Sequence, residues 1–143
     1  MKKILRYIAI LPASTLAWVI GIFLGGIISM ITMSYIGLGP SGFNLGLFYT
    51  AGEANEGISP LYLGIIMFFA NITGIALMVA TGCAVAPAHK KVIGWSLYGL
   101  AVAYNIVHNI PNFWGWQCIG IILSIIASAF IVYDLLANVF EES

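Results

Sequence analysis

Apolar residues occupy four long stretches of this chain, and short polar or glycine-rich segments separate them. Charged residues are missing from residues 7–52, 57–89 and 92–133. A helix needs about 20 apolar residues to cross a bilayer, so uncharged stretches of this length are typical of transmembrane helices. The pattern predicts an all-α bundle of four transmembrane helices, at about residues 8–33, 60–85, 92–108 and 116–139.

Proline marks three of the predicted helix boundaries. Ser59 and Pro60 are typical of a helix start. A serine side chain can accept a hydrogen bond from a free backbone N–H group, and proline at the first helical position has no N–H group that would be left without a partner. Pro87 is expected to end the second helix. The segment 109–112, which contains Pro111, predicts a turn at the membrane surface, and the aromatic residues that follow it are typical of the interface.

Small residues recur at every fourth position in the first and last stretches. Residues four apart lie on one side of a helix, and small side chains allow another helix to approach closely. The two ridges consist of Ala13, Ala17, Gly21, Gly25 and Ser29, and of Gly120, Ser124 and Ser128. We expect them to pack within one subunit or between subunits, and two ridges on so small a chain favour self-assembly. Replacing Gly21 and Gly25 with leucine is then expected to disrupt assembly without preventing insertion.

The longest connection, residues 36–59, is rich in glycine and carries an apolar patch too short to span a bilayer. Its aromatic residues are expected at the membrane surface. A connection of this length without clear structure is often functional. We therefore predict an outer recognition loop whose candidate residues are Phe43, Phe48, Tyr49, Glu53 and Glu56.

Composition supports one integral membrane domain over residues 1–143. Of the 143 residues, 62% are hydrophobic and 7% charged, whereas a soluble domain carries roughly 25% charged residues. The basic start resembles a secretory signal peptide, but such peptides have apolar cores of about 7–15 residues, and this stretch is longer. We expect an uncleaved anchor. The formal net charge of zero gives no argument for nucleic-acid binding.

The basic residues predict the orientation of the helices. Lys2, Lys3 and Arg6 precede the first stretch, and Lys90 and Lys91 lie between the second and third. Four spans would put both groups on one side, which the positive-inside rule makes cytoplasmic. We expect a multi-pass protein of a bacterial inner membrane with both termini in the cytoplasm.

Four polar residues within the stretches form a candidate polar pathway: Asn71, Asn105, His108 and Asp134. Polar groups inside a membrane span often mark a function. Tyr98, Asn105 and His108 are expected on a single face of the third helix. The competing interpretation is structural, with Asn71 bonded to a neighbouring helix at about 1 kcal/mol and Asp134 at the inner surface.

Catalytic and metal-binding patterns are missing from the sequence. It contains no nucleophile elbow, phosphate-binding loop or paired-cysteine motif, so we expect a protein that is not an enzyme. His89 and His108 are 19 residues apart, about 28 Å along a helix, which excludes haem ligation by both within one chain. Glu53, Glu56 and His108 lack a regular metal-binding spacing. We expect no cofactor and no metal.

Residues 82–90, with the sequence GCAVAPAHK, together with the basic start and the four-span layout, resemble small uncharacterised inner-membrane proteins of bacteria. The resemblance covers the layout of the whole chain. It implies a bacterial four-helix membrane protein and transfers no activity.

Two main functions remain open at this stage, besides a sensor of envelope damage or invasion that would use the outer loop and that no residue specifically indicates. The first is a non-enzymatic membrane subunit that acts in assembly or recognition, as a homo-oligomer or with another membrane protein. The alternative is a small channel or transporter for an ion, a proton or a small solute. If Asn71 and Asn105 face a hydrated cavity, transport is favoured; if they bond to adjacent helices in a dry core, the assembly or recognition hypothesis is favoured.

Overall fold

The structure is a computed structural model that describes residues 2–36, 60–112 and 115–140. The described elements are helical throughout: α1 (Lys2–Tyr35), α2 (Pro60–Val85), α3 (Lys90–Tyr104), the π-helical segment η2 (Asn105–Asn109), α4 (Ile110–Asn112) and α5 (Trp116–Asn138). Within the described residues, α1, α2 and α5 are long and apolar enough to cross a membrane. The five candidate loop residues, Phe43 to Glu56, lie outside the described ranges.

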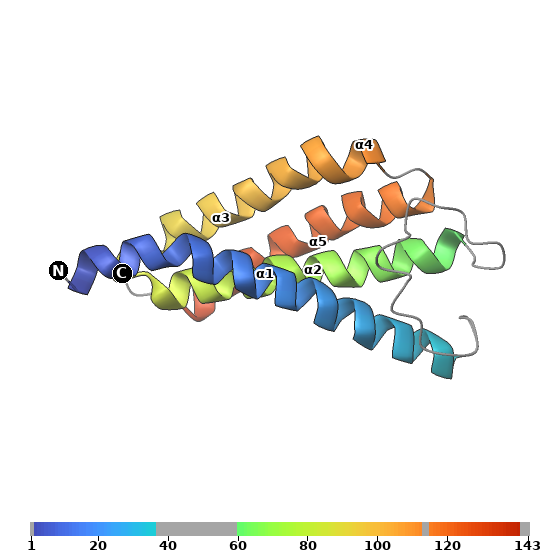
Figure 1. Cartoon of the computed structure of the whole chain (residues 1–143), viewed down its shortest axis with the longest axis horizontal. Helices are drawn as coiled ribbons and strands as arrows, with labels where there is room; N and C mark the ends of the chain where they lie inside the picture. The colour runs from blue at the N-terminus through green and yellow to red at the C-terminus, as the bar shows by residue number, and fades with distance from the viewer. Residues whose placement is uncertain (1, 37–59, 113–114, 141–143) are drawn as a thin grey trace.

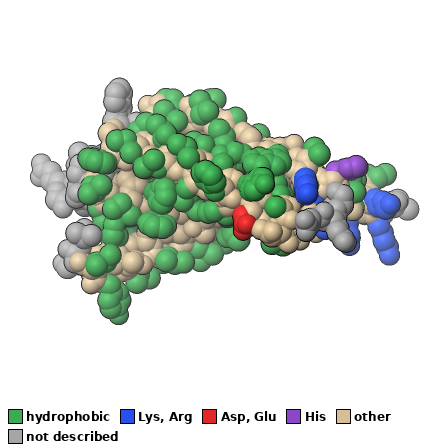
Figure 2. Space-filling model, turned by 180° about the vertical axis from the view of Figure 1, so that it is seen from behind, with side chains coloured by type: hydrophobic (Ala, Val, Ile, Leu, Met, Phe, Trp, Pro, Cys, Tyr) green, Lys and Arg blue, Asp and Glu red, His purple; other side chains and the backbone are tan. Residues whose placement is uncertain are grey.

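Helix α2 is the centre of an elongated arrangement, and α1, α3 and α5 all pack against it (Figure 1). The start of α1, the α2–α3 connection and the end of α5 lie at one end of the molecule. Lysine and arginine side chains gather at that same end, while apolar side chains cover most of the remaining visible surface (Figure 2). The structure therefore combines an apolar body with one basic end.

Helices α1 and α2 approach each other through glycine. A Cβ atom on Gly21 would lie 2.7 Å from the Gly74 Cα and the Thr73 carbonyl oxygen, both backbone atoms of α2. A Cβ on Gly25 would lie 2.7 Å from the Phe69 carbonyl oxygen. This part of the first ridge therefore packs against α2 of the same chain.

The two alanines of that ridge lie at its margin, because Ala13 and Ala17 are only partly buried whereas Ser14 is fully buried. An α-helix has 3.6 residues per turn, so a row of every fourth residue winds slowly around the axis. The buried face instead follows the axis and takes Ser14 in place of Ala13, while Trp18, which is partly buried like Ala17, packs against the buried apolar core. Ser29, at the far end of the row, is buried.

Helices α2 and α5 also pack through glycine. A Cβ on Gly120 would collide with the Gly64 carbonyl group, and one on Gly64 would lie 2.5 Å from the Trp116 carbonyl oxygen. Ser124 and Ser128 continue this face of α5 and are fully buried. The second ridge, like the first, packs within the chain.

The buried apolar residues form two clusters. The larger one lies towards the basic end, where residues of all four long helical segments meet: Ile10, Ile75, Met78, Val79, Cys83, Ala86, Leu97, Ala101, Val132 and Leu136. The smaller one joins α1 to α2 towards the opposite end and contains Met30, Met33, Tyr62 and Ile66. Helix α1 thus contributes to a cluster of four helical segments at one end and to a cluster with α2 alone at the other.

The third helical segment extends beyond its predicted end. The sequence predicts a helix to residue 108 and a turn over 109–112, but helical backbone continues through η2 and α4 to Asn112. Tyr98 faces α5 and donates a hydrogen bond to the Ile125 carbonyl oxygen at 2.7 Å. Tyr98 is half-buried and Asn105 is fully buried, whereas His108 is exposed, so these three side chains do not share one face.

Candidate functional site: a lateral cleft between two helices

A cleft opens between α1 and α3. At the basic end Ser14 of α1 and Leu97 of α3 both lie beside Gly82 of α2. Further along, α1 and α3 are bridged by the rings of Trp18 and Tyr104, whose centroids are 4.8 Å apart in an edge-to-face contact. The two helices therefore converge at one end and are separated by a cleft beyond it.

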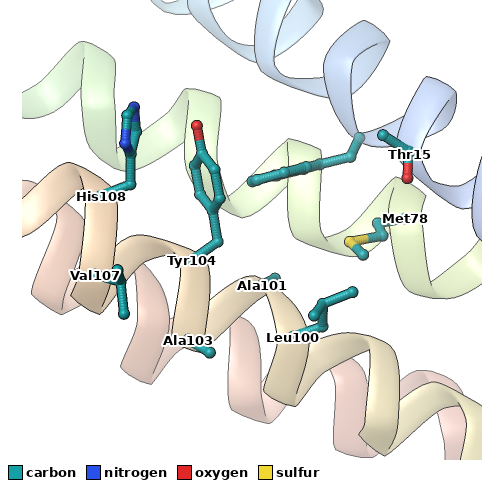
Figure 3. A pocket seen from close by; sticks show the side chains of 9 residues that line it. Thr15, Met78, Leu100, Ala101, Ala103, Tyr104, Val107 and His108 are labelled. Carbon is teal, nitrogen blue, oxygen red and sulfur yellow. The ribbon is translucent and has the colours of Figure 1, made fainter.

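The first part of the cleft, which we call the inner chamber, has a volume of about 550 Å³ (Figure 3). Tyr104 and His108 stand on one side of the α3–η2 helix at one end of the view, and Thr15 and Met78 lie at the other. The residues that line the inner chamber are Thr15, Trp18, Met78, Leu100, Ala101, Ala103, Tyr104, Val107 and His108. Its lining is apolar except near its ends.

The second part, the outer chamber, has a volume of about 270 Å³ and shares Trp18 and Tyr104 with the first. All four helical segments contribute to its wall, which contains Trp18, Val19, Ile22, Met67, Ala70, Asn71, Tyr104, Asn109 and Ile121. Two amide side chains, Asn71 and Asn109, therefore reach the cleft. The Trp18–Tyr104 pair is the boundary between the two chambers.

Gly74 positions the tryptophan ring. A Cβ on Gly74 would lie 2.8 Å from Cδ1 and 3.1 Å from Nε1 of Trp18. Because glycine has no side chain, the indole lies directly over the α2 backbone and reaches across to Tyr104. Tyr104 in turn lies 5.0 Å from the ring of His108, measured between centroids. A row of three rings thus runs along the cleft.

A chain of hydrogen bonds connects three helices behind the cleft. Asn109 Nδ2 donates to Asn105 Oδ1 at 2.7 Å, and Asn105 Nδ2 donates to Asn71 Oδ1 at 3.3 Å. Asn71 Nδ2 donates to Ser124 Oγ at 2.7 Å, and the serine donates to the Ile121 carbonyl oxygen. Asn105 also donates to the Ala101 carbonyl oxygen at 2.9 Å. The polar groups of this chain of bonds are therefore satisfied mainly by one another, whereas the buried Ser14 Oγ and Trp18 Nε1 have no hydrogen-bond partner among the described residues.

The π-helical segment explains which polar residues meet. The Ile110 N–H bonds to the Asn105 carbonyl oxygen, one residue further back than in an α-helix. Pro111 follows at once, and proline has no N–H to donate and crowds the carbonyl group four residues earlier. In the widened turn, Asn109 rather than His108 remains on the face of Asn105. The Asn112 side chain donates a hydrogen bond to the His108 carbonyl oxygen. This bond gives a partner to one backbone acceptor of the widened turn.

The four residues of the predicted polar pathway do not form one pathway. Asn71 and Asn105 are bonded to each other, while His108 is exposed at the rim of the inner chamber. Asp134 is exposed on α5 and accepts a hydrogen bond from Asn138 of the same helix. Asp134 lies outside the hydrogen-bond chain because it is ten residues beyond Ser124, about 15 Å along α5.

Of the residues that line the cleft, only Asn71 and His108 were predicted as site residues, and Trp18, Tyr104 and Asn109 are the most important of those that were not. Trp18 precedes Tyr104 by 86 residues, so nothing in the sequence pattern brings them together. Asn109 was expected in a turn. The cluster of asparagines around Pro111 was the available signal, because polar residues beside a proline within a membrane helix can satisfy displaced backbone groups.

A further cavity lies between α1, α2 and α5, with a volume of about 490 Å³. Its wall is apolar and includes Met33, Phe68, Trp116 and Leu123. It lacks the amide groups that distinguish the α1–α3 cleft, so the cleft is the better candidate for a specific site.

Metal ligation finds no support among the described residues, where no group of three His, Cys, Asp or Glu side chains lies close enough to hold an ion. Glu53 and Glu56 lie outside the described ranges.

Comparisons of the chain with protein-family models, with curated proteins and with solved structures gave no match.

Proposed function

We propose that this chain is a non-enzymatic integral membrane protein that recognises another membrane component through the α1–α3 cleft. In this proposal α3, η2 and α4 form a fourth span, both termini are cytoplasmic, and the membrane is a bacterial inner membrane. The basic residues at one end of the molecule support this orientation under the positive-inside rule.

The observation that carries the proposal is the form of the cleft. It opens sideways between two helices and combines apolar walls with a small number of convergent amide groups, as specific binding sites commonly do. The π-helical turn beside it adds support, because such turns frequently occur at functional sites. The hydrogen-bond chain behind the cleft favours recognition over transport, because Asn71 and Asn105 bond to neighbouring helices and to each other.

Photo-crosslinking in native membranes tests this proposal. A benzoylphenylalanine placed at Ala103, an exposed residue of the cleft wall, is expected to capture a discrete membrane component. The same group at Ala84, an exposed alanine of α2 that does not line either chamber, is the matched control. Equal and featureless labelling at both positions would contradict recognition through the cleft.

Self-assembly is the second part of the proposal. Both small-residue ridges pack within the chain at Gly21, Gly25 and Gly120, so a homo-oligomer would use other surfaces. Large apolar side chains of α1 and α5 are exposed, including Ile8, Leu16 and Phe130. Native mass spectrometry of the protein in lipid nanodiscs counts subunits and co-purifying partners directly, and a solitary monomer without a partner would contradict assembly.

Transport of a small solute is the alternative, and the outer chamber is the observation that favours it. Asn71 and Asn109 line this chamber, and Asn71 lies near the middle of α2. A solute flux in proteoliposomes that is lost in Asn71→Leu but kept in Asn138→Leu would favour transport over recognition.

A further inference from the structure

We infer that the α1–α3 cleft binds one acyl chain of a glycerophospholipid from the outer leaflet, with the ester and headgroup region at Asn109 and His108. The inference rests on the proposed recognition function and orientation, and it names the component that the cleft recognises.

Access to the cleft is lateral. Its inner chamber lies between α1 and α3, and exposed residues of α3 and η2, such as Leu100, Ala103 and Val107, form part of its wall. In a bilayer these residues face the hydrocarbon region. A molecule that is already in the bilayer can therefore enter without crossing the polar surface.

The polarity of the cleft changes along its length in the direction that a phospholipid requires. The end that carries His108 and Asn109 has the imidazole and amide groups, and the wall then becomes apolar towards Leu100, Ala101 and Met78. At that far end the Thr15 hydroxyl donates to the Leu11 carbonyl oxygen of its own helix. The basic residues lie beyond the apolar end. A lipid bound in this cleft thus has its headgroup away from the basic end and its chain pointing towards it.

The depth of the polar groups fits the ester region of a leaflet. Trp116 begins α5, and a tryptophan at a helix end is typical of the membrane interface. Ser124 is eight residues further, about 12 Å along the helix, and it is bonded to Asn71. Asn109 is four residues, about 6 Å, from Asn105 in the outward direction. Asn105 bonds to Asn71 and therefore lies at about the depth of Ser124. Asn109 is then roughly 6 Å below the level of Trp116, in the region where lipid ester groups begin.

The width of the cleft favours an acyl chain over a helix. A helix with its side chains is about 10–12 Å across. The rings of Trp18 and Tyr104 bridge the cleft with centroids 4.8 Å apart, so a helix would have to break this contact to enter. An acyl chain is slim enough to lie along the rings without separating them, with the ring pair between its polar end and the inner chamber.

The polar end offers hydrogen-bond donors for a lipid. An asparagine amide has two N–H donors, and the bond to Asn105 uses one donor of Asn109. The Asn109 side chain reaches the outer chamber, where its second N–H can donate to an ester carbonyl oxygen. The exposed ring of His108 can donate an N–H to a phosphate or ester oxygen.

The test is lipid retention after purification in a mild detergent, measured by native mass spectrometry. We expect one phospholipid mass per chain in the unmodified protein. Ala103→Phe places a ring in the inner chamber and is expected to abolish retention, while Ala84→Phe retains the lipid. Asn109→Ala is expected to lower occupancy about fivefold, the effect of one lost hydrogen bond. Asn138→Ala, at an exposed site of α5 that lines neither chamber, is the control for this change.

Each outcome is decisive. Melting temperatures of the four variants show whether a loss of lipid reflects loss of fold, and only variants that melt within a few degrees of the unmodified protein are compared. Equal retention in Ala103→Phe and Ala84→Phe overturns the lipid inference. Detection of a bound protein in place of a lipid also overturns the lipid inference but leaves the proposed recognition function intact. If neither a lipid nor a protein partner is detected, the lipid inference and the recognition function are both overturned.

Discussion

Helix α1 meets two neighbours in opposite ways. Against α2 it presents glycine, and the Gly21 Cα region approaches the Gly74 backbone so closely that a single added carbon would collide. Towards α3 it presents Trp18, whose ring spans the gap to Tyr104. The same apolar helix therefore forms a tight interface on one side and a cleft on the other.

The difference shows that side-chain size, and not hydrophobicity, decides how helices associate in a membrane. Lipid is as apolar as leucine, so burial of an apolar side chain gives no drive for association, and van der Waals fit decides instead. Glycine allows a close fit between backbones, whereas two large rings keep the helices apart and leave chambers on either side of them.

The largest effect is expected for the double change Gly21→Leu with Gly25→Leu, which attacks the tight side of α1. Overpacking costs about 1–3 kcal/mol per site, so we expect a loss of about 2–6 kcal/mol in unfolding free energy. Unfolding in mixed micelles measures it. Since both glycines face α2, the change is expected to separate α1 from α2 whether or not the protein assembles. Unchanged stability would contradict the α1–α2 packing.

The next effect is expected for Gly120→Ala, because the new methyl group would collide with the Gly64 carbonyl group of the α2 backbone. We expect destabilisation by about 1–3 kcal/mol in the same unfolding assay. Gly99→Ala is the matched control, because a Cβ on Gly99 has no neighbour within 4 Å among the described residues. The control is expected to be neutral or up to about 1 kcal/mol more stable, because alanine favours helix.

A smaller effect is expected for Asn105→Leu, which breaks the hydrogen-bond chain behind the cleft. Asn105 is fully buried and bonded to Asn71, Asn109 and the Ala101 carbonyl group. Hydrogen bonds between membrane helices contribute on average about 0.6 kcal/mol each, so we expect a loss of about 1–2 kcal/mol. Asn138→Leu, at an exposed site, is expected to change stability by less than about 0.5 kcal/mol.

The smallest change in stability, with a clear change in geometry, is expected for Pro111→Ala. Restoring the N–H at position 111 allows the regular α-helical bond to the Val107 carbonyl group and removes the cause of the widened turn. Position 108 then rotates towards the face of Asn105. Labelling of His108→Cys by a maleimide is expected to be slower with Pro111→Ala than without it, and an unchanged rate would show that the π-helical turn has another cause.

The sequence by itself determined where most of the helices lie. The uncharged apolar stretches predicted the all-helical fold and its membrane character, and the structure places α2 at residues 60–85, as Ser59 and Pro60 indicated. These features depend on residues close together in the chain, because an apolar stretch and a local proline act on their own segment whatever the rest of the fold does.

The tertiary structure alone decided which faces meet and where the site lies. At the start of the row, Ser14 is buried in place of Ala13, because the contact follows the helix axis and not the sequence interval. Asn71, Asn105 and Asn109 became one hydrogen-bond chain because of a π-helical turn and the position of α2. The cleft depends on the pairing of Trp18 with Tyr104, which are distant in sequence, and such contacts arise only when whole helices pack.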